Sequence, residues 1–367
     1  MILKITRQNV HTGLAAVSAS IPTKTTLPVL SNVLIEADGE SVWISGTDLD
    51  VSIRVKVPAE VAQGGTITVP GRKLQEIARE LPDAPVEMRV RGRQLEIGCG
   101  NSRFKLNGLA SEEFPNFPAI DFEDGWTISE TSLRSLIQAT AFAVSNEESR
   151  PILNGVLWEI EESRMSMVAT NGHRLARMGV DSGSGGAGTA EFIVPPSALN
   201  QVERLFDGDG ELTVARAANH LGFRSDTREV YTRLIDGRYP NYEQVIPKDN
   251  DKLATVDKTA MEAAVRRTAV VASTQTHKIK LAFGTDTVRL EATTPDLGEA
   301  SDELQLQYEG DALEIGFNAN YLLEVLRNMP AGEVRMSFKT AERATTIQPT
   351  DTELDYLCLI MPLRLVD

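Results

Sequence analysis

Short segments in which apolar and polar residues alternate dominate the chain. Examples are residues 42–46 (VWISG), 65–70 (GTITVP), 86–92 (VEMRVRG) and 94–98 (QLEIG), with Gly, Asp or Asn between such segments. Alternation with a period of two is typical of strands with one buried face, and the polar breaks are typical of turns. The pattern therefore predicts many short strands in antiparallel sheets.

Six segments follow a helical pattern instead. Their apolar residues recur at spacings of three and four, as at Leu133, Leu136 and Ile137. Ser129 and Asp257 stand where helix N-caps are expected, because their side-chain oxygens can accept from free backbone N–H groups of the first turn. The predicted helices are residues 7–20, 71–81, 129–145, 195–206, 257–273 and 318–329.

The pattern repeats along the chain. Residues 27–50 align without a gap on residues 150–173 at an offset of 123, so that Thr47 meets Thr170, and a second step of 123 reaches Thr293. An aromatic-Pro-Asn sequence also recurs, at residues 114–116 and 239–241. Three units of about 122 residues account for all 367.

Each unit contains two predicted helices and about eight predicted strands. This organisation predicts an α+β fold of three repeated domains, each with two helices packed on antiparallel sheets. The acidic, polar segments 121–126 and 247–252 have the composition of linkers. We therefore expect domains at residues 1–124, 125–250 and 251–367.

The composition is that of a globular protein, with 41% hydrophobic and 24% charged residues. No apolar run approaches the ~18 to 20 residues that span a membrane, and residues 1–10 lack the features of a signal peptide, which predicts a cytoplasmic protein. Cys99 and Cys358 belong to no Cys-x-x-Cys pair, which argues against a disulfide framework or a zinc site.

Charge is unevenly distributed. The net charge of -15 opposes nonspecific binding to nucleic acid by the chain as a whole. The six predicted helices nevertheless sum to about +3, which leaves about -18 for the remainder. Each basic side chain could simply belong to a solvent-exposed helix face without binding anything. The separation of positive and negative charge across all three units favours the binding of a polyanion on the side of the helices.

Catalytic and metal-binding patterns are weak. The histidines lie in unrelated contexts, without the i, i+4 spacing of a helical metal site, so we expect no metal or cofactor; they are His11, His173, His220 and His277. Residues 182–188 (SGSGGAG) loosely resemble a phosphate-binding loop, but the Gly-Lys-Ser/Thr ending is missing, and a flexible surface loop is the simpler interpretation.

Two further polar clusters invite a catalytic interpretation. Asp48 and Asp50 could lie as paired carboxylates on one face of a strand, although polar residues at a strand end are the simpler interpretation. Residues 168–178 (VATNGHRLARM) combine His173 and Arg174 with an Asn-Gly pair that is typical of turns. The local sequence leaves open whether these side chains perform chemistry, bind a ligand or only neighbour a turn.

Seven ordered sequence blocks identify a resemblance that covers the whole chain. They read TLPVLSNVLIE, GTDLD, FPNFP, RPILNGVLWE, VATNGHRLA, DGRYPNYEQVIP and LIMPLRL. Together they resemble the bacterial sliding clamp, the β subunit of the replicative DNA polymerase III. The resemblance implies a head-to-tail homodimer whose six similar domains form a closed ring, with helices lining the hole and sheets on the outer rim.

The same resemblance implies a docking site for short peptides that carry Leu and Phe, in the polymerase III α subunit, the clamp loader and other partners. Gln244 stands where some relatives have a basic residue. The implied site consists of Leu153, Thr170, Gly172, His173, Arg174, Leu175, Pro240, Gln244, Val245, Leu359 and Met361.

Two more residue sets follow from the resemblance. Phe104 and Leu106 of one copy would face Val271 and Ala272 of another across the dimer interface. Sequence-independent contact with double-stranded DNA would come from basic residues near the helices, because phosphate contacts carry no sequence information. These DNA-facing candidates are Lys24, Arg72, Lys73, Arg150, Arg266 and Arg267, with Arg103 and Arg327 as further candidates.

The leading hypothesis is thus a non-enzymatic processivity ring without catalytic residues. One rival is an enzyme that uses His173, Arg174, Asp48 and Asp50, but no group of complementary chemistry accompanies them. The other rival is a repeat-built peptide-binding scaffold that does not encircle DNA, and such a scaffold would need no basic bias on its helices.

Overall fold

The computed structural model describes residues 1–181 and 188–365. The described chain forms two compact units. The first comprises Met1–Arg134 and Ser197–Leu234, and the second comprises residues 135–181, Gly188–Pro196 and residues 235–365. The glycine-rich loop predicted at 182–188 lies, apart from Gly188, outside the described residues.

All six predicted helices are confirmed. They are α1 (Arg7–Val17), α2 (Gly71–Glu80), α3 (Glu130–Thr140), α4 (Pro196–Leu205), α5 (Lys258–Thr268) and α6 (Ala319–Asn328). The first helix of each repeat is shorter than predicted, because its last turn is a 3-10 helix: η1 (Ser18–Ser20), η4 (Ala141–Ala143) or η7 (Ala269–Val271). The predicted N-caps are also confirmed: Ser129 Oγ accepts from Ser132 N at 3.0 Å, and Asp257 Oδ1 accepts from Ala260 N at 2.8 Å.

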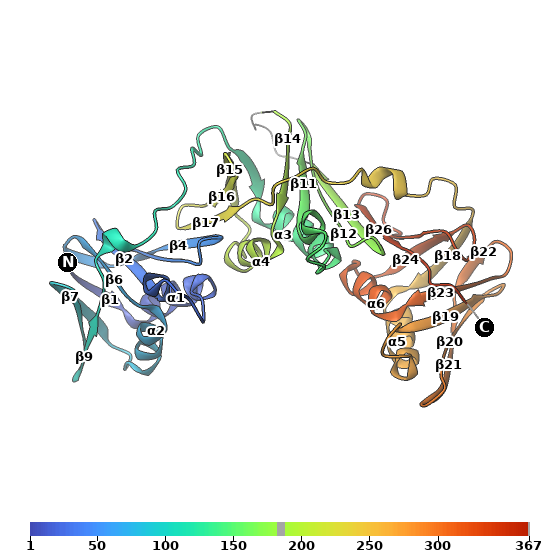
Figure 1. Ribbon diagram of the computed structural model, residues 1–367, viewed down its shortest axis with the longest axis horizontal. Helices are drawn as coiled ribbons and strands as arrows, with labels where there is room; N and C mark the ends of the chain where they lie inside the picture. The colour runs from blue at the N-terminus through green and yellow to red at the C-terminus, as the bar shows by residue number, and fades with distance from the viewer. Residues whose placement is uncertain (182–187, 366–367) are drawn as a thin grey trace. The chain divides into compact units, whose positions relative to one another are not determined.

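The first unit contains two antiparallel sheets. The five-stranded sheet has the order β5-β1-β7-β8-β9, and the eight-stranded sheet has the order β10-β15-β16-β17-β4-β3-β2-β6. Helices α1 and α2 lie side by side, and α1 packs on β3 and β4 (Figure 1). The strands are β1 (Ile2–Thr6), β2 (Asn32–Asp38), β3 (Ser41–Thr47), β4 (Val51–Pro58), β5 (Glu60–Gln63), β6 (Gly65–Pro70), β7 (Pro85–Arg91), β8 (Gln94–Cys99), β9 (Ser102–Asn107), β10 (Trp126–Ser129), β15 (Glu211–Ala217), β16 (His220–Arg224) and β17 (Arg228–Arg233).

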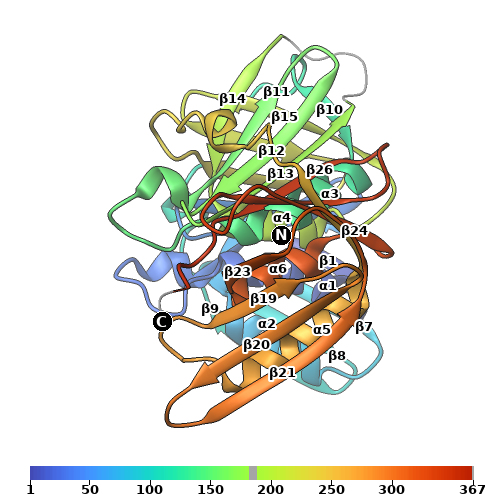
Figure 2. The same ribbon diagram turned by 90° about the vertical axis from the view of Figure 1, so that its right-hand side faces the viewer.

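The second unit also contains two antiparallel sheets. The nine-stranded sheet has the order β14-β11-β12-β13-β26-β25-β24-β18-β22, and the four-stranded sheet has the order β21-β20-β19-β23. Helix α5 packs against β20, β21 and α6 (Figure 2). The strands are β11 (Val156–Ile160), β12 (Arg164–Thr170), β13 (Arg174–Asp181), β14 (Ala190–Val194), β18 (Lys252–Asp257), β19 (Lys278–Phe283), β20 (Thr287–Thr294), β21 (Gly298–Gln305), β22 (Gln307–Glu309), β23 (Leu313–Asn318), β24 (Glu333–Phe338), β25 (Thr345–Pro349) and β26 (Asp355–Ile360).

In each unit, one sheet joins strands from two neighbouring repeats. We call the pairing of β4 with β17 the first seam and the pairing of β13 with β26 the second seam. Ser52 pairs with Tyr231 in the first seam, and Leu175 pairs with Leu359 in the second. Since Ser52 and Leu175 are separated by the repeat offset of 123, the two seams can be compared residue by residue.

A shared hydrogen bond fixes the equivalence of the last strands of the three repeats. Shortly after β9, β17 and β26, one backbone N–H donates to a carbonyl of β6, β14 or β23; the donors are Leu109, Ile235 and Leu363, at 3.1, 2.9 and 2.8 Å. Four residues before these donors stand Lys105, Tyr231 and Leu359. The two seams therefore have the same register. On β9, Lys105 is the counterpart of Tyr231 on β17 and of Leu359 on β26.

Candidate functional site

The segment 170–174 is a tight turn between β12 and β13. Thr170 Oγ1 accepts from Gly172 N at 3.1 Å, and Asn171 Oδ1 accepts from the N–H groups of His173 and Arg174 at 2.9 and 3.0 Å. Gly172 has a φ of 87°, which a residue without Cβ adopts at little cost. The turn interpretation of the Asn-Gly pair is confirmed.

The first repeat builds the same turn with different residues. Thr47 Oγ1 accepts from Leu49 N at 3.1 Å, and Asp48 Oδ1 accepts from the N–H groups of Asp50 and Val51 at 3.0 and 2.7 Å. Asp48 and Asp50 thus lie in the turn after β3, which confirms the interpretation as polar residues at a strand end. The alternative, paired carboxylates on one face of a strand, is wrong. The carboxylate of Asp48 is occupied by backbone N–H groups, as is typical of an Asx-turn.

An apolar cluster lies beside the 170–174 turn, in the second unit. Leu153, Leu175 and Leu359 are at most 8% exposed. These three residues form the floor of the site. Three further apolar residues near it remain exposed: Pro240, Val245 (55%) and Met361 (38%). The cluster consists of Leu153, Leu157, Val168, Leu175, Ile193, Tyr239, Tyr242, Ala344 and Leu359. A buried apolar floor with an exposed apolar rim can receive apolar side chains of another molecule.

Hydrogen bonds connect the segments that carry the predicted docking residues. Met361 N donates to His173 O at 2.8 Å, and Thr170 N donates to Tyr239 Oη at 3.1 Å. The 3-10 helix η6 (Tyr242–Val245) carries the exposed Gln244. The structure thus joins the 170–174 turn to the end of β26 and to the segment that begins at Tyr239.

Arg174 differs from the other predicted docking residues, because its side chain is committed within the protein. Arg174 is 6% exposed, forms an ion pair with Glu324 on α6 and donates to the carbonyl oxygen of Phe142. Its guanidinium lies 4.7 Å from the ring centroid of Tyr321 and 5.4 Å from that of Phe142. The residue therefore fastens β13 to α6 and η4 inside the second unit.

Replacing Arg174 with Ala should lower the free energy of unfolding by about 3 kcal/mol, because the change leaves a void and an unpaired Phe142 carbonyl. Glu324→Gln should cost only about 1 kcal/mol, since the Glu324 side chain is 40% exposed and water replaces the lost charge contact. Guanidinium unfolding curves of both variants measure the two values. Equal losses would contradict the assignment of Arg174 as the buried fastening residue.

A cavity of about 550 Å³ lies next to Arg174, on the side of α6. His173 and Tyr321 line it, with ring planes 17° apart and centroids 6.4 Å apart. Asn320, Tyr321 and Glu324 were missed by the sequence reasoning. In the sequence, these residues are recognisable only as polar positions of the predicted helix 318–329. Nothing in the sequence shows that this helix lies beside the 170–174 turn.

A second cavity, of about 500 Å³, adjoins Pro240 and is lined in part by Tyr239, Tyr242 and Glu159. Tyr242 Oη donates to Glu159 Oε2 at 2.8 Å. Burial, together with this hydrogen bond and the negative charge of Glu159, raises the pKa of Tyr242 to about 12. The phenol is therefore neutral at physiological pH and acts as a hydrogen-bond donor.

The raised pKa of Tyr242 predicts a loss of stability at alkaline pH. An unfolded tyrosine titrates near pH ~10. The folded state therefore binds the Tyr242 proton more tightly, and this contribution is complete below pH ~10 and is lost as the pH rises toward about 12. Tyr242→Phe should reduce the alkaline fall in the free energy of unfolding. Chemical denaturation at a series of alkaline pH values checks this, and an unchanged slope would contradict it.

The predicted DNA-facing cations are exposed but mostly paired. Carboxylates contact four of the six: Lys73 pairs with Glu76 at 2.6 Å, Arg150 with Glu147 at 2.7 Å, Arg267 with Asp302 at 2.6 Å, and Arg266 with Glu262. Arg72 Nη2 lies 3.5 Å from the carbonyl oxygen of Ile21, and Lys24 lies on an exposed loop between η1 and η2 (Pro28–Ser31). Among the further candidates, Arg327 also pairs with Glu262, at 3.6 Å.

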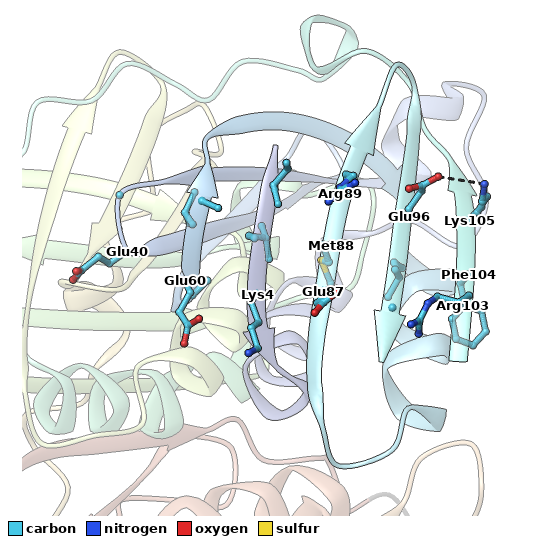
Figure 3. A pocket seen from close by; sticks show the side chains of 18 residues that line it. Lys4, Glu40, Glu60, Glu87, Met88, Arg89, Glu96, Arg103, Phe104 and Lys105 are labelled. Carbon is cyan, nitrogen blue, oxygen red and sulfur yellow. Dashed lines mark ion pairs between the residues drawn. The ribbon is translucent and has the colours of Figure 1, made fainter. Parts of the chain in front are cut away.

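The predicted interface residues lie next to two free sheet edges. Phe104 and Leu106 are half-buried on β9, the last strand of the five-stranded sheet. Figure 3 shows the position of Phe104 on this strand. Lys105 between them pairs with Glu96 at 3.2 Å (Figure 3). Strand β21 is the last strand of the four-stranded sheet.

Near β21, the exposed apolar residues differ from those expected. Val271 is half-buried, and Ala272 is only 6% exposed within its own unit. Val270 and Leu297 are 77% and 62% exposed, and the sequence reasoning missed both. Val270 adjoins the predicted pair Val271 and Ala272 in sequence. Only the orientation of η7 decides which of these side chains is exposed.

Within residues 1–181 and 188–365, no group of three or more His, Cys, Asp or Glu side chains is placed to hold a metal ion. None of the helices in these ranges is long and apolar enough to cross a membrane.

Comparison with known proteins gives the same three-part organisation. Residues 1–118 match the N-terminal domain, residues 127–241 the central domain and residues 243–364 the C-terminal domain of the DNA polymerase III beta subunit. The beta sliding clamp of Pseudomonas aeruginosa is 33% identical over 368 residues, and that of Escherichia coli (strain K12) is 30% identical; each match covers 100% of both chains.

Solved structures agree with the sequence matches. A DnaN sliding clamp from Pseudomonas aeruginosa bound to griselimycin has a TM-score of 0.95 at 33% identity, with 100% of both chains covered. A DNA polymerase sliding clamp from Bacillus subtilis has a TM-score of 0.95 at 28% identity, also with 100% of both chains covered. With its three clamp domains, the chain belongs to the family of the DNA polymerase III β subunit, the β sliding clamps.

Proposed function

We propose that two copies of this chain associate head to tail into a closed ring around double-stranded DNA, and that the ring holds polymerases through the apolar site beside the 170–174 turn. β sliding clamps are processivity factors rather than enzymes. The observation that carries the ring proposal is the shared register of the two seams, together with free edges at β9 and β21. A head-to-tail contact closes into a ring when the same rotation recurs at each step.

The position of β21 within its repeat supports this arrangement. Thr293 is the third-repeat counterpart of Thr47; Thr47 is the last residue of β3, and Thr293 is the last but one of β20. Thr293 pairs with Glu299 across its hairpin, as Thr47 pairs with Ser52. Glu299 on β21 therefore occupies the place that Ser52 occupies on β4, in the first seam.

The two counterparts define a register for a third seam, between copies. Ser52 pairs with Tyr231 in the first seam, and Lys105 is the counterpart of Tyr231 on β9. Glu299 of one copy would thus pair directly with Lys105 of a second copy. β21 joined to β9 in this way would continue the five-stranded sheet into the four-stranded sheet.

Charge and shape at the two edges are complementary. β9 presents the exposed cations Arg103 and Lys105, whereas β21 presents the exposed carboxylates Glu299 and Glu303. Opposite charges placed across two strands stabilise their pairing. The apolar part of the interface would pack Phe104 and Leu106 of one copy against Val270 and Val271 of the other, with little contribution from the buried Ala272.

For DNA, the proposal assigns sequence-independent phosphate contact to Lys24 and Arg72, supported by Lys73, Arg150, Arg266 and Arg267. Cations that already pair with carboxylates add little net attraction to phosphate, because an ion pair presents no net charge at a distance. Each phosphate that is neutralised adds a salt-dependent increment of affinity. A closed ring stays on DNA because it encircles the duplex, so it needs few phosphate contacts.

For partner proteins, the proposal assigns the docking of short Leu- and Phe-containing peptides to the floor of Leu153, Leu175 and Leu359 and to the exposed Val245 and Met361. Apolar anchors seated on a dry floor supply most of the affinity of such contacts. The remaining predicted docking residues frame this surface: Thr170, Gly172, His173, Pro240 and Gln244. The expected partners are the α subunit of the polymerase and the clamp loader, and the expected location is the cytoplasm. The domain boundaries 1–124, 125–250 and 251–367 remain predictions.

Retention on DNA distinguishes the ring from a peptide-binding scaffold that does not encircle DNA. After loading onto a nicked circle, the protein should remain bound through gel filtration at moderate salt and should be lost once the circle is cut. Lys24→Ala with Arg72→Ala should leave retention on the circle intact, because topology does not depend on individual phosphate contacts. Equal retention on circular and linear DNA would rule out encirclement.

A further inference from the structure

The first seam contains a small counterpart of the proposed docking site. A cavity of about 180 Å³ lies there, and its lining includes Thr47, Ser52, Pro115 and Tyr231. Their counterparts in the second unit are Thr170, Leu175, Pro240 and Leu359. All four of these belong to the proposed docking site, so that the two seams offer equivalent places with different side chains.

The difference is concentrated in one cross-strand pair. The first seam pairs the small Ser52 with the large Tyr231, whereas the second seam pairs Leu175 with Leu359. Both pairs occupy the same register position. An aromatic ring thus occupies the first seam at the position where the second seam has the aliphatic floor of the docking site.

Tyr231 is held firmly in this position. It is 4% exposed, and its ring centroid lies 5.6 Å from that of Phe117 and 6.3 Å from that of Phe122. Its hydroxyl donates to Glu229 Oε2 at 2.7 Å, and Glu229 also pairs with Arg224 at 2.9 Å. A ring fixed by aromatic neighbours and a buried carboxylate does not move aside for a ligand at little cost.

The mouth of the first seam is narrowed as well. Leu49 stands in the turn where the second repeat has Gly172. Leu49 has a φ of 81° and is 53% exposed, so a branched side chain projects where the second seam has none. The remaining cavity of about 180 Å³ has room for one side chain, and a peptide that inserts both Leu and Phe needs more.

We propose that Tyr231, opposite Ser52, fills the first-seam counterpart of the docking site, and that the pair Leu175 and Leu359 restricts peptide docking to the second seam. This inference rests on the proposed docking function of the second seam. It assigns a specificity role to Ser52 and Tyr231, which lie outside the proposed docking site.

Exchange of the residues between the seams tests the inference. The opened variant carries Leu49→Gly, Ser52→Leu and Tyr231→Leu, and its matched control carries Leu49→Gly, Ser52→Leu and Tyr231→Phe, which keeps the ring. The probe is a short synthetic peptide with Leu and Phe anchors, and calorimetric titration gives the number of peptides per chain. We expect one for the unchanged chain, two for the opened variant and one for the control.

The reverse exchange provides a test that does not depend on the folding of the opened variant. Leu175→Ser with Leu359→Tyr should reduce peptide affinity at least about tenfold while thermal unfolding shows a folded protein. Tight binding by this variant would overturn the inference, as would one peptide per chain for a folded opened variant. An unchanged chain that binds no peptide would instead refute the proposed docking function.

Discussion

Replacing Lys105 with Glu converts the ring into monomers at concentrations where the unchanged chain remains dimeric. The new carboxylate would face Glu299 of the second copy, and attraction would become repulsion at both interfaces of the ring. A change of about 1–2 kcal/mol at each interface weakens dimerisation on the order of a hundredfold. Sedimentation equilibrium over a concentration series measures this shift.

The chain offers a matched control for this experiment. Arg91 and Lys105 contact the same carboxylate, Glu96, and both side chains are 64% exposed. Arg91→Glu makes the same change of charge away from the predicted register, so it should leave the dimer nearly unaffected. Adding Glu299→Lys to Lys105→Glu should restore the dimer. A double variant no stronger than the single variant would show that these residues do not face each other.

Replacing Met361 with Asp weakens the binding of Leu- and Phe-containing peptides at least about thirtyfold. The new carboxylate would lose water when a peptide covers it, and the guanidinium of Arg174 is already paired with Glu324. A cost of at least about 2 kcal/mol corresponds to a loss of affinity of about thirtyfold or more. Calorimetric titration with the synthetic peptide measures the change.

Leu354 provides the control for Met361, because both side chains are 38% exposed and both lie in the second unit. Leu354→Asp places the same charge on the same unit, outside the proposed docking surface, and should leave peptide affinity unchanged. Both variants should change the unfolding temperature by a similar, small amount, since the two side chains are equally exposed. Equal losses of affinity in the two variants would contradict the docking assignment.

The repeat explains why so much of the fold could be predicted from sequence. Helix positions follow from apolar spacing and caps such as Asp257, which are local properties of the chain. The turn at 170–174 was likewise predictable from its Asn-Gly pair. Strand pairing across the seams depends on residues far apart in sequence, and the repeat offset was the one signal that related them.

The side chains around the candidate site were less predictable. Arg174 looks like a ligand-binding residue in sequence, because nothing local reveals that Glu324 lies beside it, 150 positions later. Asp48 was expected as a polar residue at a strand end, but the sequence did not reveal that its carboxylate accepts from two backbone N–H groups. In both cases the deciding contact is a hydrogen bond, which a pattern of apolar positions does not encode.

The free edges at β9 and β21 have a consequence for polymerisation. A lone copy carries two mutually complementary edges, and unpaired edges template the addition of further strands. If a substitution at the interface altered the angle between copies without weakening their pairing, the second contact would miss its partner, and copies would add end to end into an open filament. In the proposed ring, closure would therefore protect the protein from aggregation, and the geometry at Glu299 and Lys105 would be under constraint even where binding strength is not.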